Sequence, residues 1–588
     1  MLSIIYHFYD KRIKDVLHLH RVLIKNRDMK SKILLLIITL SFGFGSLFAQ
    51  SQRIVLFEEF TSTTCGPCAS QNPAFDALLN QNLDKAVSIK YHMSWPAPGN
   101  DPFYLDNETE NNNRRSYYGI NSVPHVHMDG SNWNGQPSQV SQGRIDNEYG
   151  VASPFEIQVQ TELSPGEDTI FVTTLIKATD EITTNLVVHN VVVEKYLHFN
   201  TPPGPNGERD FYTVMKKMLP SASGTNLEAP MSDGDYVILQ NSWALDYIYD
   251  IDELAVVSFI QNNLNKEVFQ AALSSEDALT PIYSLDAEVL DVDNVTATNC
   301  FGTLNPIITI RNNGQVNLTS MTIEYSVNDG AVQSADWTGD LAFLETAEIQ
   351  LDEIAFDVQE LNSLEIVGVS PNGSTDDYIT NNTFVYLFDE APVLSGSVNL
   401  FMILDESPEE TTWELTNSSG EVIQNGGPYD TPGMKIEPLD LSTMDCYELI
   451  MYDAGGNGMC CSNGDGYYAV IYGNNQTAFE GSDFGSLDRN QLSYDPVGID
   501  ETPVYNDLNI FPNPVKDVLN VEFNLLETSD VDLKVYDLLG KVIYENDKGV
   551  NQVGRQSYNL HLGDLNSGIY LFKLNVNGQT YVKKITVR

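Results

Sequence analysis

The spacing of apolar positions divides the chain into an N-terminal part that mixes strands with helices and a longer part that contains mainly strands. Between residues 53 and 150, short apolar runs alternate with segments of helical character. The expected strands are 54–57, 87–91 and 123–129, and the expected helices are 68–79, 107–118 and 137–149. Alternating strands and helices predict an α/β layer with a mixed sheet.

After Pro154 the pattern becomes rich in strands. The expected strands are 155–161, 169–177, 185–194 and 254–261. They predict a β domain over residues 151–280, and later turn signals predict two immunoglobulin-like sandwiches, 284–390 and 391–493. A turn-rich linker at 494–506 precedes a last unit of short strands, 507–588.

Residues 29–49 have the composition of a secretory signal peptide. Two lysines precede the apolar run 33–40, and small residues lead to a plausible cleavage site before Gln50. The segment of about 17 residues is short and interrupted by glycine, so we expect cleavage and no permanent transmembrane span. Residues 1–28 are basic and irregular, and we interpret them as an over-called start.

Charge excludes one class of partner. Without residues 1–49, the chain has 24 basic and 78 acidic residues, a net charge of −54. Such a surface repels phosphate backbones, so nucleic-acid binding is disfavoured. Most of this charge precedes the last unit, because residues 507–588 carry a net charge of only −1.

The sequence Cys65-Gly66-Pro67-Cys68 is the main candidate for chemistry. Two cysteines separated by two residues can close a disulfide and open it again. When such a pair starts a helix, the positive end of the helix dipole favours the thiolate of the first cysteine.

The residues around this motif resemble the thioredoxin fold. Glu59 lies six residues before Cys65, Pro73 lies five residues after Cys68, and the run YGINSVPHVHMDG places Pro124 where thioredoxins keep a cis-proline. The resemblance implies that Cys65 attacks a substrate disulfide and that Cys68 resolves the mixed disulfide. It also implies that Glu59 moves the proton and that Pro124 turns the backbone toward the motif.

Two departures weaken this resemblance. Thr64 replaces the tryptophan that usually precedes the first cysteine, and a long insert separates the motif from Pro124. The insert, together with the segments 206–224 and 253–272, resembles the outer-membrane-protein-28-related family. That family pairs a thioredoxin-like domain with a following β domain, and its function is poorly defined, so the resemblance implies architecture more than activity.

Three interpretations of the cysteine pair stay open. In the first it is a working dithiol that exchanges disulfides. In the second it is a permanently closed structural disulfide, because an extracellular location supplies no obvious source of electrons. In the third, Cys65 and Cys68 capture a metal together with His125 or His127, although the spacing differs from that of the copper chaperones of this fold.

The last unit resembles the type A C-terminal sorting domain of the type IX secretion system of Bacteroidetes. Four blocks carry the resemblance in the expected order: LNIFPNPVKDVLNVEF, LKVYDLLGKVIYE, LGDLNSGIYLFKL and YVKKITVR. The resemblance implies export across the inner and outer membranes, with the secretion machinery as a partner through residues 507–588. It also implies a cell-surface or extracellular location.

The remaining cysteines and a glycine-rich loop give weaker signals. We expect Cys446 to bond either Cys460 or Cys461, and the other of the two either bonds Cys300 or stays free. The oxygen donors Asp453, Asn457, Asn463 and Asp465 follow one another in the same loop. They suit Ca²⁺ or are plain turn residues, because no glutamate closes an EF-hand pattern. No other cofactor is required.

Together these features predict a multidomain α/β plus all-β protein. A thioredoxin-like domain at 50–150 is followed by β-sandwich modules and a small β-sandwich sorting domain. The leading hypothesis is an exported protein that exchanges thiols and disulfides, with Cys65, Cys68, Glu59 and Pro124 as catalytic residues. The alternative is a non-catalytic binding or adhesion protein with a structural disulfide, so enzymatic activity stays open.

Overall fold

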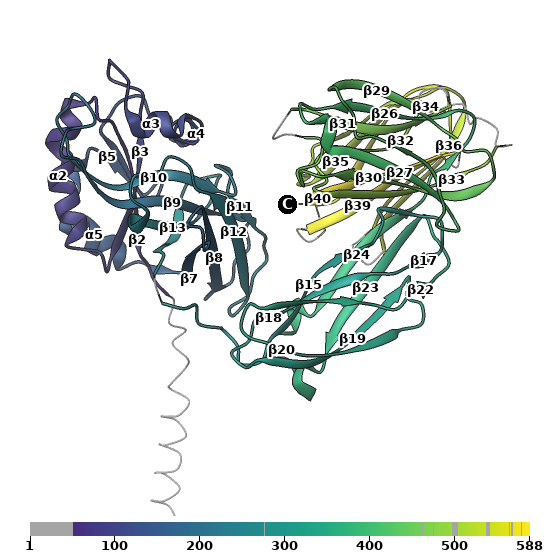
Figure 1. The fold of residues 1–588 in the computed structure, drawn as a ribbon, viewed down its shortest axis with the longest axis horizontal. Coiled ribbons are helices and arrows are strands. Elements are labelled where there is room, and N and C mark those ends of the chain that lie inside the picture. The colour runs from purple at the N-terminus through teal and green to yellow at the C-terminus, as the bar shows by residue number, and fades with distance from the viewer. Residues whose placement is uncertain are drawn as a thin grey trace, which may run out of the picture. The chain divides into compact units, whose positions relative to one another are not determined.

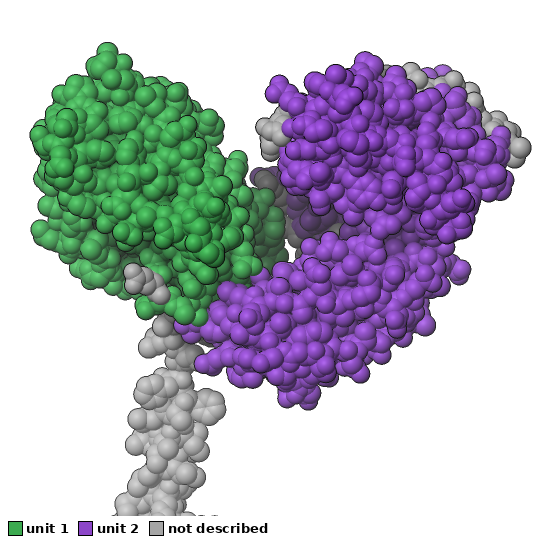
Figure 2. All heavy atoms as spheres, viewed as in Figure 1, with its two compact units in different colours: residues 1–279 green, residues 280–588 purple. Residues whose placement is uncertain are grey.

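The computed structural model describes residues 51–588, except residues 276, 461–463, 474–475, 497–503, 537–540, 564, 566–567, 578 and 588. The predicted signal peptide and the residues before it lie outside the described part. The chain forms two compact units, unit 1 up to Leu279 and unit 2 from Thr280 to Arg588 (Figure 2). Each unit is described by itself.

Unit 1 is built on one nine-stranded sheet (Figure 1). Its strand order is β14-β13-β9-β10-β3-β2-β4-β5, and β11 also pairs with β9. The strands are β2 (Val55–Thr61), β3 (Ala86–His92), β4 (His125–Met128), β5 (Trp133–Gly135), β9 (Leu186–His198), β10 (Asp210–Leu219), β11 (Thr225–Leu227), β13 (Leu254–Gln261) and β14 (Val268–Leu273).

Sequence pattern explains the centre of this sheet. Every residue of β2 and β3 is buried, and the two strands pair in parallel from Val55 opposite Ala86 onward. The apolar residues of the two segments suit strands that are covered on both faces, and the charged Glu58, Glu59 and Lys90 are buried there in ion pairs. β10 then pairs in parallel with β3 at Val214 and Lys90, which joins the first 130 residues to the later strands.

Two helices of unit 1, α3 and α4, begin at polar capping residues. Asp101 caps α3 through its carboxylate, Asn107 caps α4, and α4 ends at Gly119, whose positive φ suits glycine. The helices are α2 (Gly66–Asn80), α3 (Pro102–Asp106), α4 (Glu108–Tyr118) and α5 (Gln142–Tyr149), with the short 3₁₀ segments η1 (Pro137–Gln139) and η2 (Ile251–Glu253).

One face of the large sheet has two covers. Phe75 and Leu79 of α2 and Ile145 of α5 pack against Val55 and Phe57 at the β2 end. A three-stranded sheet of order β12-β8-β7 packs at the β9 and β13 end. Its strands are β7 (Phe155–Leu163), β8 (Thr169–Ala178) and β12 (Tyr236–Ala244), and the small pair at the start is β1 (Ser51–Gln52) and β6 (Ala152–Ser153).

The described part of unit 2 contains three separate hydrophobic cores, each between sheets of mainly antiparallel strands. The first core uses β15 (Ala287–Asp293), β16 (Thr298–Asn299), β17 (Thr303–Leu304), β18 (Ile307–Asn312), β19 (Leu318–Val327), β20 (Gln333–Leu341), β21 (Thr346–Gln350), β22 (Ile354–Ala355), β23 (Leu361–Val369) and β24 (Thr383–Glu390), with η3 (Pro371–Gly373) and η4 (Ile379–Asn381).

The second and third cores repeat this design. The second uses β25 (Val393–Leu394), β26 (Val398–Leu404), β27 (Thr411–Asn417), β28 (Val422–Gly426), β29 (Gly433–Leu439), β30 (Asp445–Asp453), β31 (Tyr467–Tyr472), β32 (Gln476–Gly481) and β33 (Leu487–Tyr494), with η5 (Pro408–Glu410). The third uses β34 (Tyr505–Phe511), β35 (Val518–Leu525), β36 (Ser529–Tyr536), β37 (Val542–Asn551), β38 (Gly554–His561), β39 (Gly568–Val576) and β40 (Gln579–Val587).

The predicted fold class is wrong. The described chain is nearly all β, and its N-terminal part is not a separate thioredoxin-like α/β domain. The predicted strands and helices between residues 54 and 149 do form. However, β2, β3, β4 and β5 complete a sheet whose other half comes from residues 186–273. Periodicity reports only local structure, and it could not reveal that β10 pairs with a strand more than a hundred residues earlier. The domain boundaries inside unit 2 remain predictions.

Candidate functional site

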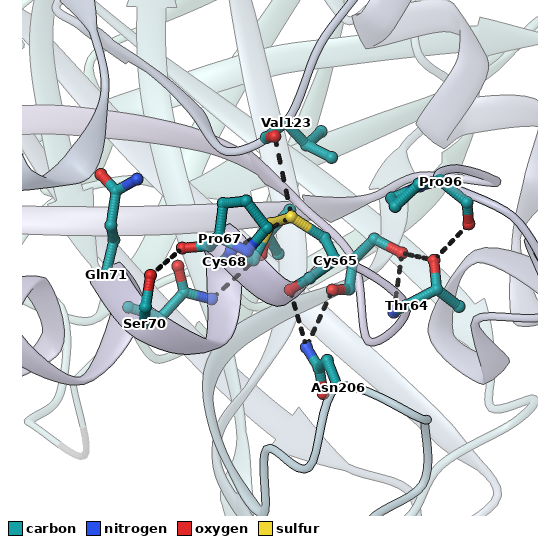
Figure 3. Close-up of a disulfide and its surroundings, with 12 residues drawn as sticks. Thr64, Cys65, Pro67, Cys68, Ser70, Gln71, Pro96, Val123 and Asn206 are labelled. Carbon is teal, nitrogen blue, oxygen red and sulfur yellow. Dashed lines mark hydrogen bonds between the residues drawn. A yellow bond between two sulfur atoms is a disulfide. The ribbon is translucent and has the colours of Figure 1, made fainter.

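The Cys65 and Cys68 side chains form a disulfide where β2 turns into α2 (Figure 3). Cys65 is the N-cap of α2, and the backbone N–H of Cys68 donates to Cys65 Sγ over 3.1 Å. Pro67 lies in the first turn, where the missing N–H costs nothing. This arrangement would favour a thiolate at Cys65 if the bond were reduced.

Both sulfur-bearing residues are buried. Cys65 is 1 % exposed and Cys68 is 0 % exposed. The carbonyl oxygen of Val123 lies 3.6 Å from Cys65 Sγ, and the Val123–Pro124 peptide bond is cis, as expected from the sequence. The structure therefore places Pro124 beside the disulfide, but it leaves almost no sulfur surface open to solvent.

A covering segment, residues 204–208 between β9 and β10, packs against the turn that carries Cys65. The backbone N–H of Asn206 donates to the Thr63 carbonyl over 3.1 Å, and its side-chain amide donates to the carbonyls of Ser62 and Cys65 over 3.2 and 3.3 Å. Gly204 lies so close to Thr63 that a side chain there would collide with it. Asn206 and Val123 thus hold the Cys65 end of the disulfide from opposite sides (Figure 3).

Glu59, the predicted proton carrier, lies in a buried charged cluster. Its Oε2 atom is 3.1 Å from Nζ of Lys90, which also contacts Oδ1 of Asp76 at 2.5 Å. Burial raises the pKa of Glu59 to about 7, although Lys90 opposes the rise. Burial also raises the pKa of Asp76. Glu59 can therefore hold or release a proton near neutral pH.

Glu208 joins the covering segment to this cluster. Its two carboxylate oxygens accept hydrogen bonds from Asn72 over 2.8 Å and from Asn206 over 2.7 Å. Burial raises the pKa of Glu208, and both amides oppose the rise. Sequence reasoning missed Lys90, Asp76 and Glu208. Lys90 and Asp76 were signalled only by their polarity within β3 and α2, and Glu208 lies outside any helix or strand and gave no such signal.

The two histidines of the metal hypothesis serve other contacts. His127 on β4 is buried, its Nδ1 lies 2.7 Å from the Gly130 carbonyl, and its ring stacks on Tyr118 at 4.0 Å between centroids. Burial lowers the pKa of both His125 and His127. In the part of the chain that the structure describes, no group of three or more His, Cys, Asp or Glu residues could hold a metal ion.

The proposed calcium ligands do not assemble either. Asp453 is buried and its Oδ2 accepts the Asn457 N–H over 3.0 Å, which makes an ordinary turn. Asp465 forms an isolated bridge with Cys460. Asn463 lies outside the described residues. The calcium hypothesis is therefore not supported.

The cysteine pairing in unit 2 differs from the expected one. Cys446 on β30 bonds Cys300, which follows β16, so this bridge joins the first and second sandwiches. Gln491 on β33 reinforces the junction, because its Oε1 accepts the Cys300 N–H and its carbonyl accepts the Thr298 hydroxyl. Cys460 is also disulfide-bonded. The expected pairing of Cys446 with Cys460 or Cys461 is wrong, because strands from different modules meet at Cys300.

Within the described residues, no helix is long and apolar enough to cross a membrane. No curated protein matches the chain. Among solved structures, the chain is similar to HBP35 of Porphyromonas gingivalis, with 14 % identity over 58 % of this chain and 99 % of that one, at a TM-score of 0.33.

Two further solved structures are similar at lower scores. One is a CARDB domain from Pyrococcus furiosus, with 15 % identity over 20 % of this chain and 100 % of that one, at a TM-score of 0.16. The other is the BSP domain of a biofilm associated protein, with 10 % identity over 74 % and 96 %, at a TM-score of 0.14. Similarity at this level assigns neither fold nor function, and the resemblance to the outer-membrane-protein-28-related family remains a prediction.

The C-terminal part of unit 2 matches a family model. Residues 509–588 match the family model of the secretion system C-terminal sorting domain. They correspond to the third core of unit 2, whose strands run from β34 to β40. This chain therefore carries a type IX sorting domain, which directs it to the cell surface or the extracellular space through the secretion machinery.

Proposed function

We propose that this exported protein is a non-catalytic binding protein in which Cys65 and Cys68 form a permanently closed structural disulfide. The observation that carries the proposal is the burial of both cysteines, 1 % and 0 % exposed. Thiol–disulfide exchange needs a thiolate to reach one sulfur of the bond, so access limits the reaction. The contacts of Asn206 and Val123 with the Cys65 end oppose that access.

Location favours the same function. The sorting domain directs the chain out of the cell, where disulfides persist and no thioredoxin or glutathione pool reduces them. A closed bridge at the start of α2 then fixes the first turn of the helix against β2. The binding surfaces would lie elsewhere on unit 1 and on the sandwiches of unit 2.

The reduction potential of the Cys65–Cys68 pair tests this proposal. We expect a value below about −300 mV, typical of structural disulfides, together with no reduction of insulin by the chemically reduced protein. Cys65→Ser serves as the control for any residual activity. A higher potential with insulin reduction that disappears in Cys65→Ser would contradict the proposal.

Thiol–disulfide exchange is the second candidate, and the charged cluster favours it. Cys65 caps a helix, and Glu59 has a pKa near the pH at which a resolving thiol must lose its proton. This function would require residues 204–208 to move away from the turn. It would also require an extracellular or periplasmic reductant, and the potential measurement separates the two candidates.

A further inference from the structure

A groove runs along α2 on the side of the covering segment. Its volume is about 460 Å³. Ala69, Pro73, Asp76 and Ala77 of α2 form one wall, and the segment from Asn206 to Tyr212 forms the other. The helical wall from Ala69 to Asn80 is about 16 Å long, which exceeds the length of one side chain. The groove thus has room for a short extended segment of polypeptide.

The charge beside this groove is not balanced. Glu59, Asp76 and Glu208 are three buried carboxylates, and Lys90 is one buried lysine beside them. Lys90 contacts the first two directly, whereas the hydrogen bonds to Glu208 come from the neutral amides of Asn72 and Asn206. Burial without full pairing destabilises the ionised form, which agrees with the raised pKa of all three groups. Asp76 and Glu208 also line the groove, so a cation placed there would reduce the imbalance.

The end of the groove at β10 adds a carboxylate and aromatic rings. Asp210 accepts the Tyr196 hydroxyl over 2.8 Å and pairs with His198 at 2.7 Å. The rings of Tyr196 and Tyr212 lie 5.0 Å apart, and Tyr212 lines the groove. A carboxylate beside aromatic rings suits an ammonium or guanidinium group with an apolar stem. Arg209 is a cation of the same wall, but its guanidinium binds the Asn200 carbonyl.

We propose that this groove binds a lysine or arginine side chain of an extended polypeptide. The carboxylates of the walls favour a cation, and a volume of about 460 Å³ has room for an organic cation with an apolar stem. The proposal deepens the proposed function, since it rests on the protein's being a binding protein and names a ligand class.

The test is calorimetric titration of the full mature chain in about 0.15 M salt, where long-range attraction to the acidic surface is screened. The probes are acetyl-Gly-Gly-Lys-Gly-Gly-amide and the same peptide with uncharged norleucine in place of lysine. We expect the lysine peptide to bind at least about tenfold more tightly than the norleucine peptide. Equal affinities for the two peptides, or no binding of the lysine peptide, would overturn the proposal.

Two matched variants locate the binding. Ala77→Arg places a fixed cation on the groove wall, and Ala74→Arg places the same charge on an exposed part of α2 outside the groove. We expect Ala77→Arg to weaken binding of the lysine peptide about tenfold and Ala74→Arg to change it less than about twofold. An equal loss of affinity in both variants would mean that the peptide is attracted diffusely to an acidic surface, and it would contradict binding in the groove.

The outcomes separate this inference from the proposed function. If the disulfide stays closed and the lysine peptide does not bind, only the proposed peptide binding in the groove is contradicted. If the disulfide cycles and the protein still binds the lysine peptide, only the proposed structural role of the disulfide is contradicted.

Discussion

The Cys65–Cys68 bridge of unit 1 and the Cys300–Cys446 bridge of unit 2 differ both in the loop they close and in their access to solvent. The first spans a sequence separation of 3 and is buried, and the second spans 146 and is partly exposed. In the chain-entropy model these loops correspond to about 2 and about 5 kcal/mol of stabilisation. The bond that matters more for stability is therefore the easier one to reach.

The two bridges have different structural roles, which the number of cysteines alone does not distinguish. Cys300–Cys446 ties two sandwiches together, each with its own apolar core. Cys65–Cys68 restrains only the first turn of α2, and its surroundings consist of buried charges and amide hydrogen bonds. Four changes test whether this difference holds.

Removal of the long-range bridge should have the largest effect. The double variant Cys300→Ala/Cys446→Ala should lower the free energy of unfolding of the two joined sandwiches by about 5 kcal/mol, because the unfolded chain regains the entropy of a long loop. Urea unfolding followed by limited proteolysis of unit 2 measures this loss. An unchanged unfolding midpoint would show that the noncovalent contacts at Gln491 hold the two sandwiches together without the disulfide.

Replacement of the buried carboxylate should give a pH-dependent effect. The pKa of Glu59 is raised from 4.5 to about 7 by burial, so the folded state binds a proton more tightly than the unfolded state. This stabilisation is fully present below pH 4.5 and is lost as the pH rises through about 7. As the pH rises across that range, the free energy of unfolding of the wild type should therefore fall by up to about 3 kcal/mol relative to that of Glu59→Gln.

Chemical unfolding of unit 1 at several pH values measures this difference. The control is Glu162→Gln on β7, an exposed position. A difference for Glu59→Gln that stays constant with pH would mean that the pKa of Glu59 is the same in the folded and unfolded states, which would contradict the raised value.

Removal of the short-range bridge should cost less than removal of the long one. Cys65→Ala/Cys68→Ala should lower the free energy of unfolding of unit 1 by about 2 kcal/mol, since a short loop restrains the unfolded chain weakly. Thermal unfolding of the full mature chain provides the measurement. A loss as large as that of the Cys300 and Cys446 variant would refute the loop-length account.

Weakening of the covering segment should have the smallest effect on stability. Asn206→Ala removes the side-chain hydrogen bonds to Ser62, Cys65 and Glu208, and we expect a loss of roughly 1 kcal/mol. The same variant should speed reduction of the Cys65–Cys68 bond about tenfold, because the turn becomes accessible. Thr201→Ala, an exposed change just before the covering segment, is the control. Equal reduction rates in Asn206→Ala and the wild type would show that this segment does not protect the bond.

Local features of unit 1 were predictable from its sequence. The resemblance to thioredoxins led to the expected cis bond at Pro124. Apolar runs located β2 and β3, and the polar segment from Asn107 onward located α4. Each of these depends on neighbours within a few residues. The same reasoning identified the disulfide motif but not its surroundings.

The features that decide the chemistry depend on distant residues. Asn206 covers a turn more than a hundred residues earlier, and β10 completes the sheet beside β3. Lys90 is a charged residue inside a buried strand, and only the positions of Asp76 and Glu59 explain it. Cys300 and Cys446 meet because two modules pack together. No periodicity records such contacts, which is why the fold class and the cysteine pairing were mispredicted.

The order in which the two bridges are reduced tests the central claim most directly. The native mature chain would be treated with increasing concentrations of a small phosphine reductant, alkylated, and mapped by mass spectrometry to assign each cysteine. If Cys65–Cys68 is a protected structural disulfide, the partly exposed Cys300–Cys446 bond opens first and the buried pair resists. Reduction of Cys65–Cys68 at lower reductant concentration than Cys300–Cys446 would contradict this account and favour a working dithiol.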